Sequence, residues 1–108
     1  MDKNILKVGD LCKHFKGENL IDKNIYKILA VGVKYSGDKV EEKLENLVVY
    51  ENIFQNRIFN REYEVLVGEI EKEKQEKFHQ KYRVEPLSKE EVEIVCSEEF
   101  KKQKLNGN

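Results

Sequence analysis

Three arginines are the residues of this chain whose chemistry is easiest to predict. Of its 20 basic residues, 17 are lysines, and the arginines are Arg57, Arg61 and Arg83. A guanidinium is a planar fork of N–H donors that matches a phosphate or a carboxylate, so a lysine-rich chain is expected to use arginine where that fork is needed. Phe59 lies two residues before Arg61, and Tyr82 lies beside Arg83. A ring next to a guanidinium can stack a base while the cation holds its phosphate, so the pattern predicts a nucleotide site.

A structural role is the alternative interpretation of the same residues. Arg61 and Arg83 would then pair with carboxylates of the expected barrel, such as Glu64 or Glu85. The neighbouring rings would fill the core.

His14 and Lys16 form a second candidate pair for binding an anion. An imidazole at the end of a strand, followed by an ammonium in a turn, could face the same ligand. The turn at Gly17 has too few glycines for a phosphate-binding loop and does not open a helix, so ATP hydrolysis is disfavoured. In the alternative interpretation, residues 16–17 are only a hairpin turn and His14 is hydrogen-bonded for structure.

Catalysis and metal binding are weaker hypotheses. Cys12 and His14, two residues apart on a predicted strand, would share a face as nucleophile and base of a small nucleotide hydrolase or transferase. No third group that would orient them is apparent in the sequence. Zinc ligation by Cys12, His14, His79 and Cys96 has the right ligand number but lacks the Cys-x-x-Cys spacing. We therefore expect neither an enzyme nor a bound metal or cofactor.

Length, composition and charge exclude several classes of protein. A chain of 108 residues is expected to form a single domain with a modest core. A net charge of −1 argues against non-specific nucleic-acid binding. Two cysteines are too few for a disulfide scaffold. Without an apolar leader or a run of about 20 apolar residues, we expect a soluble cytoplasmic protein with no membrane partner.

Residues 1–68 are predicted to be rich in strands. Apolar, β-branched segments at 8–15 and 25–35 are joined by turn residues, and a second pair lies at 47–50 and 58–67. A hairpin turn is expected at 55–57, where Asn56 tolerates a left-handed conformation. The polar stretch between residues 36 and 45 shows no periodicity and is interpreted as a loop.

The last third of the chain is predicted to contain two helices and a short strand. Residues 69–80 are charged helix formers with few apolar positions, and residues 82–85 alternate like a strand. Ser88 and Glu91 form a capping box that opens a helix over 88–104. The apolar stripe of this helix consists of Val92, Val95, Cys96 and Phe100. We expect it to pack on the barrel or on another subunit. We accordingly expect a homo-oligomer.

Several motifs resemble those of a known family. They are Val8-Gly9-Asp10, His14-Phe15-Lys16-Gly17, Tyr26, Leu47-Val48-Val49-Tyr50 and Gln80-Lys81-Tyr82-Arg83. Over about residues 8–85 the chain is similar to the bacterial and phage family of domain of unknown function number 1653, whose members look like small SH3-type β-barrels. Arg61 and Arg83 fall on motif positions of that family. The family's His-Ser-Glu-Thr becomes Tyr35-Ser36-Gly37-Asp38, so no site residue is carried over there.

The resemblance implies a small SH3-like β-barrel. With the polar helix and the C-terminal amphipathic helix predicted from the residues, the expected fold class is mainly β with two helices. Because the family occurs on phage genomes, the resemblance also implies a bacterial or phage-infected host cell. A specific version of nucleotide binding is then a phage-encoded sponge that sequesters a defence signal such as a cyclic ADP-ribose isomer. A protein- or nucleic-acid-interaction module of SH3-like fold remains the alternative, with nucleic acid the less favoured partner.

Overall fold

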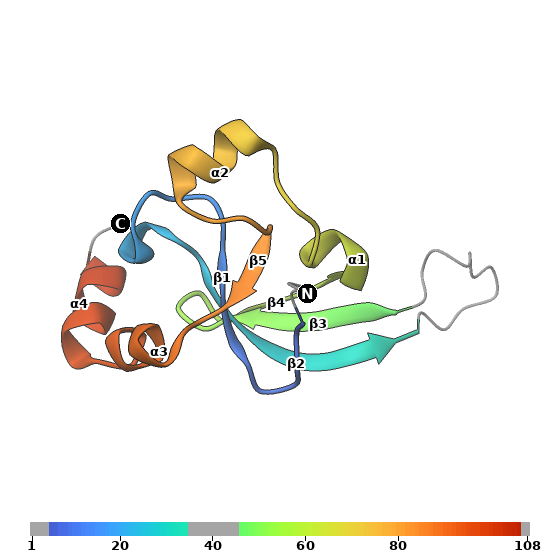
Figure 1. The fold of residues 1–108 in the computed structure, drawn as a ribbon. Helices are drawn as coiled ribbons and strands as arrows, with labels where there is room; N and C mark the ends of the chain where they lie inside the picture. Colours follow the sequence, from blue (N-terminus) through green and yellow to red (C-terminus); the bar gives the residue numbers. More distant parts are fainter. Residues whose placement is uncertain (1–4, 35–45, 107–108) are drawn as a thin grey trace.

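In the computed structural model, which describes residues 5–34 and 46–106, five antiparallel strands form one sheet (Figure 1). They are β1 (Leu11–His14), β2 (Ile25–Val33), β3 (Leu47–Asn52), β4 (Arg57–Glu62) and β5 (Val84–Pro86). Their order is β4-β3-β2-β1-β5, so β4 and β5 are the two outer strands. Within the described residues the sheet is open. The five-stranded sheet confirms a β-rich fold, but the closed barrel that we expected is not confirmed, and the described residues form four α-helices where we expected two.

The β3–β4 hairpin follows from its turn residues. Asn56 has a positive φ of 53°, as the sequence suggested, and its backbone N–H donates to the carbonyl of Asn52. The side-chain Oδ1 of Asn52 accepts the backbone N–H groups of Phe54 and Gln55. These bonds place the turn at residues 53–56, so β4 already begins at Arg57.

Two predicted strands are shorter than we expected. The strand predicted over 58–67 ends at Glu62, because Tyr63–Leu66 form the helical turn α1, which buries Leu66. The strand predicted over 8–15 is reduced to β1, because a turn precedes it in which Asp10 N–H donates to the Lys7 carbonyl. A short 3-10 helix, η1 (Leu20–Asp22), occupies part of the connection between β1 and β2.

The polar helix and the short strand that follow are confirmed with different bounds. Helix α2 spans Lys72–Phe78 instead of 69–80, because His79 adopts the left-handed conformation that ends it. No residue of α2 is buried, in line with its few apolar positions. Strand β5 covers Val84–Pro86, where we expected 82–85.

The single helix predicted over 88–104 is wrong, since two helices occupy this segment: α3 (Lys89–Val95) and α4 (Glu98–Asn106). The capping box at the start of α3 is confirmed by hydrogen bonds between Ser88 and Glu91 in both directions. The break has a local cause in Ser97. Its hydroxyl donates to the Ile94 carbonyl at 2.7 Å and accepts the Phe100 N–H at 3.2 Å, so it closes one helix and caps the next.

Each face of the sheet has its own core. Helices α3 and α4 pack against the end of one face (Figure 1), where Val95 and Phe100 contact Ile25. Of the predicted stripe, these two residues therefore pack within the chain, and Cys96 is exposed. The main core lies on the other face and consists of Leu6, Cys12, Tyr26, Ile28, Val48, Tyr50, Leu66 and Val84. None of the described helices is long and apolar enough to cross a membrane.

Candidate ligand-binding site on the aromatic face

Strand pairing brings side chains from four strands to one face of the sheet. Cys12 is paired with Tyr26, and Tyr50 with both Ile28 and Phe59, so these side chains point to the same side. Arg57, Phe59 and Arg61 alternate along β4 and share that side as well. We call this side the aromatic face.

Four rings form a continuous row across the aromatic face. The centroid of His14 lies 6.3 Å from that of Tyr26, which lies 4.8 Å from that of Tyr50. The ring of Tyr50 in turn stacks on Phe59 at 5.7 Å. Tyr26 and Tyr50 are buried, whereas Phe59 keeps 38% of its surface exposed. The row therefore ends at β4 in a ring that is open to solvent.

Cations from both ends of the sheet surround this row. The pKa of His14 is lowered from 6.5 to about 4, mainly by burial and then by the charges of four cations. These cations are Arg83, Lys16, Lys23 and Arg61. Burial raises the pKa of Tyr50, and the charges of Arg61 and Arg83 oppose that rise. Arg61 lies on the outer strand β4, and Arg83 immediately precedes the opposite outer strand β5. The charges of both guanidinium groups thus lower the pKa of the same two side chains, His14 and Tyr50.

The pairing of Arg61 and Arg83 with carboxylates, our alternative interpretation, is not observed. Among the described residues, neither arginine makes a salt bridge. The carboxylate of Glu85 instead accepts the backbone N–H groups of Lys81 and Tyr82, each at 2.9 Å. The positive charge of both guanidinium groups therefore remains uncompensated by a direct ion pair within the described chain.

The ring beneath Arg83 is Phe15, which the sequence analysis did not single out. The guanidinium carbon lies 5.6 Å from the centroid of Phe15, and Lys74 approaches the same ring at 5.9 Å. The Phe15 N–H donates to the Arg83 carbonyl at 2.9 Å. Tyr82, the predicted neighbour, contacts Lys81 at 5.4 Å. Arg83 meets Phe15 because β1 pairs with β5, which brings the residues next to these two strands side by side. No local pattern in the sequence indicates this contact.

His14 is held in one protonation and hydrogen-bonding state. Its Nδ1 accepts the backbone N–H of Lys16 at 3.3 Å, so the proton of the neutral imidazole is assigned to Nε2. The depressed pKa keeps the ring neutral at pH 7. His14 thus has the structural hydrogen bond foreseen as an alternative, and it retains one N–H donor for a ligand. The exposed Lys16 adds a cation beside it.

Arg57 is separated from this group although it shares the face. It lies opposite Asn52 at the start of β4, next to the hairpin turn. Arg57 is not among the cations that shift the pKa of His14 or of Tyr50. Of the predicted site residues, the structure therefore brings together His14, Lys16, Phe59, Arg61 and Arg83, and it leaves Arg57 and Tyr82 at the margin.

Lys23 is a cation of the site that sequence reasoning missed. Its side chain is only 4% exposed, and its Nζ donates to the carbonyls of Phe15 at 2.8 Å and Phe78 at 3.0 Å. Burial lowers the pKa of Lys23. In the sequence it stands among turn residues, which give no sign that two carbonyl groups surround it. Lys23 joins β1 to α2 and so fixes the segment that carries His14.

Cys12 has little of the chemistry that a nucleophile needs. It is fully buried, and burial, together with the charge of Asp10, raises its pKa to about 12. The reactive thiolate is therefore scarce at neutral pH. Of the other proposed zinc ligands, Cys96 is exposed at the end of α3 and His79 ends α2. Within residues 5–34 and 46–106, no three His, Cys, Asp or Glu side chains gather so that they could hold a metal ion.

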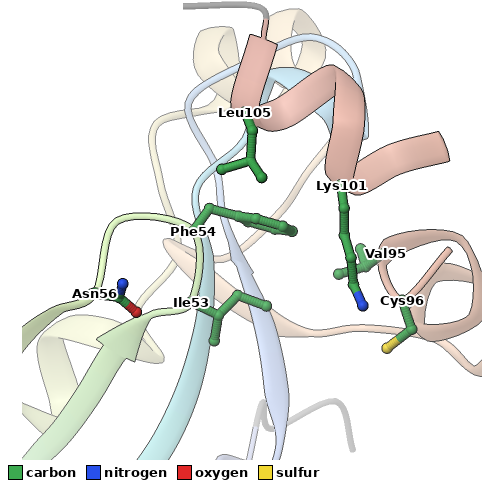
Figure 2. A pocket seen from close by; sticks show the side chains of 7 residues that line it. All are labelled: Ile53, Phe54, Asn56, Val95, Cys96, Lys101 and Leu105. Atoms are coloured by element: carbon green, nitrogen blue, oxygen red, sulfur yellow. The ribbon is translucent and has the colours of Figure 1, made fainter. Parts of the chain in front are cut away.

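A hollow lies between the β3–β4 turn and the helices α3 and α4. Its volume is about 310 Å³, and Figure 2 shows the turn residues facing the side chains of α3 and α4 across it. The lining residues are Ile53, Phe54, Asn56, Val95, Cys96, Lys101 and Leu105. This volume would admit a small ligand. The lining is largely apolar with a single ammonium, so it lacks the paired guanidinium groups that a phosphate would favour.

Comparison of the chain with protein-family models, with curated proteins and with solved structures finds no match. The resemblance to domain of unknown function number 1653 therefore remains a prediction.

Proposed function

We propose that the protein binds a small phosphate-bearing nucleotide on its aromatic face and does not transform it. One observation carries this proposal: Arg61 shares the side of the sheet with the ring row, Arg83 lies over the ring of Phe15, which stacks on His14 at the other end of that row, and neither arginine forms an ion pair within the described chain. A cationic surface beside an exposed ring suits a ligand that has both a π-face and a negative charge.

The parts of such a ligand would be bound by different residues. The base stacks on Phe59, the exposed ring of the row, an interaction worth roughly 1–3 kcal/mol per base. The phosphate accepts hydrogen bonds from Arg61 and Arg83, and charge-assisted bonds of this kind contribute about 1.5–3 kcal/mol each. The Nε2–H of His14 supplies a further donor. Because stacking adds to charge, we expect a nucleotide to bind more tightly than inorganic phosphate.

A nucleotide sponge of a phage is the specific form of this proposal. A sponge needs tight binding and no turnover, and the scarcity of thiolate at Cys12 supports the absence of nucleophilic catalysis by that residue. A cyclic ADP-ribose isomer carries adenine and two phosphates, which the ring and the two guanidinium groups would bind separately. Release of an unchanged ligand distinguishes a sponge from a hydrolase.

Native mass spectrometry tests the proposal directly. The protein is mixed with a panel of cyclic nucleotides and ADP-ribose isomers, and the double variant Arg61→Ala/Arg83→Ala serves as the control. We expect a nucleotide-sized adduct on the wild type, absent from the variant and recovered unchanged after denaturation. A wild type without adducts, or adducts of equal intensity on the variant, would contradict it.

An SH3-like interaction module remains the second candidate function. The exposed strand β4 supports it, because an outer strand can pair with an extended segment of another protein. This alternative requires no nucleotide. If the wild type binds none of the nucleotides in the panel, pull-down experiments that compare the wild type with β4 variants would test this alternative.

A further inference from the structure

The two outer strands of the sheet differ in how their free edges are protected. Strand β5 has only three residues and ends in Pro86, two features that limit pairing with other chains. Strand β4 has six residues and no proline, lysine or register shift. Its residues 57–61 are all exposed, and Ile58 keeps 63% of its surface accessible. Three residues of β4 are charged, namely Arg57, Arg61 and Glu62, so charge is the form of edge protection that β4 retains, and a further strand must pair in a register that accommodates these charges.

The backbone of β4 determines which residues can bond to a further strand. Tyr63 N–H donates to the Asn46 carbonyl of the neighbouring chain segment, and hydrogen-bonded pairs alternate along an antiparallel ladder. The odd-numbered residues of β4 consequently bond to β3. The peptide groups of Ile58, Asn60 and Glu62 point outward, where no described segment pairs with them.

We propose that β4 pairs with β4 of a second copy of this chain, antiparallel and centred on Asn60. Asn60 then lies opposite Asn60 of the partner subunit, and Ile58 lies opposite Glu62 of the partner subunit. On the aromatic face, Phe59 lies opposite Arg61 of the partner subunit. The interface is isologous, so each contact occurs twice about the two-fold axis.

Charge complementarity selects this register among those that the outward peptide groups allow. Centring the pair on Phe59 would oppose Arg57 to the partner's Arg61, and centring it on Arg61 would oppose the two Arg61 side chains. Like charges in directly opposed positions destabilise a sheet. Centring on Ile58 would overlap only residues 57–59 of each strand. The Asn60 register pairs residues 58–62 of both strands and sets each Arg61 guanidinium opposite Phe59 of the other copy.

The pairing joins the aromatic faces of the two copies into one surface. Phe59, at the end of one ring row, acquires a guanidinium from the partner subunit in addition to its own neighbour Arg61. This inference goes beyond nucleotide binding and does not depend on it, because the edge of β4 is exposed with or without a ligand. It also moves the expected self-association from the C-terminal helices, whose Val95 and Phe100 are buried in the chain, to β4.

Sedimentation of matched variants tests the pairing. We expect the wild type to sediment with twice the mass of one chain. Asn60→Pro removes an outward N–H without breaking a bond to β3 and should weaken the dimer by at least about tenfold, since two intermolecular hydrogen bonds are lost. Asn60→Ala keeps that N–H and should remain dimeric. A monomeric wild type, or an Asn60→Pro variant that is as dimeric as Asn60→Ala, would overturn the proposal.

Cross-linking tests the register without relying on a proline variant. In a Cys96→Ser background, Asn60→Cys places two thiols opposite each other at about 5.5 Å between Cα atoms, within reach of a disulfide. Copper phenanthroline should oxidise this variant to a covalent dimer, whereas Ile58→Cys should stay uncross-linked. Cross-linking of Ile58→Cys instead, or of neither variant, would overturn the register. A monomer that still binds nucleotides would overturn the pairing and leave the proposed function intact.

Discussion

The rings of Tyr50 and Phe59 stack with centroids 5.7 Å apart and planes inclined by 27°, yet only Phe59 is open to solvent. The buried Tyr50 supports a ring that can itself receive another aromatic group. Arg61, two residues further along β4, lies on the same side of the sheet. This arrangement of a supported ring and a neighbouring guanidinium is the basis of the proposed nucleotide site.

Removing either guanidinium group of the site should weaken nucleotide binding. We expect Arg61→Ala and Arg83→Ala each to raise the dissociation constant roughly tenfold to a hundredfold, because each loses a charge-assisted hydrogen bond to phosphate. The matched control is Arg57→Ala, which removes an exposed arginine of the same strand outside the group. Titration calorimetry checks this prediction, and an equal loss in all three variants would refute the assignment.

The imidazole of His14 should titrate near pH 4 instead of 6.5. The folded-state pKa is depressed, so His14 contributes stability that is present above pH 6.5 and lost as the pH falls toward 4. NMR of a His79→Gln variant follows this one imidazole. A bound phosphate would offset the surrounding cations, so a saturating nucleotide should raise the pKa. If His14 titrated near pH 6.5 in the protein without nucleotide, its ring would be neither buried nor surrounded by cations.

The two cysteines should react with thiol reagents at very different rates. Cys96 is exposed and should be labelled in the native protein, whereas Cys12 is buried and its raised pKa leaves little thiolate. Ellman's reagent should therefore detect one thiol before denaturation and two after it. Cys96→Ser should abolish the native reaction. Rapid native labelling of Cys12 in that variant would reopen the hypothesis of a nucleophile.

Gly17 is expected to be essential for the turn that presents Lys16. Its φ is +120°, and a Cβ there would lie 2.8 Å from the backbone carbonyl carbon and oxygen of Asp22. Gly17→Ala should destabilise the fold by more than about 1 kcal/mol. Gly32→Ala is the control, because Gly32 also has a positive φ but its Cβ would meet open space. Urea unfolding compares the two, and equal losses would exclude the close contact as the cause.

Local signals in the sequence predicted much of the fold. The capping box of Ser88 and Glu91 located the start of α3, and the left-handed Asn56 located the β3–β4 turn. The break at Ser97 was missed because the apolar stripe continues across it at helical spacing. The signal for the break was the serine itself, which lies between the stripe residues Cys96 and Phe100, since its hydroxyl can cap a new helix.

The candidate site was predictable only in part, because contacts between distant segments complete it. The scarcity of arginine drew attention to Arg61 and Arg83, whose role in binding stays a prediction. Their shared action on His14 and Tyr50 depends on the order of the strands in the sheet. The burial of Lys23 depends likewise on carbonyl groups from β1 and α2 meeting in space. A single sequence contains no periodic pattern for such contacts.

The most direct test of nucleotide binding on the aromatic face is an NMR titration of the ¹⁵N-labelled protein with ADP-ribose. The account predicts that the largest shift changes occur at the backbone amides of His14, Tyr50, Phe59 and Arg61, and that Arg61→Ala diminishes them. Shift changes confined to the hollow between Phe54 and Leu105, or none at saturating ligand, would contradict it.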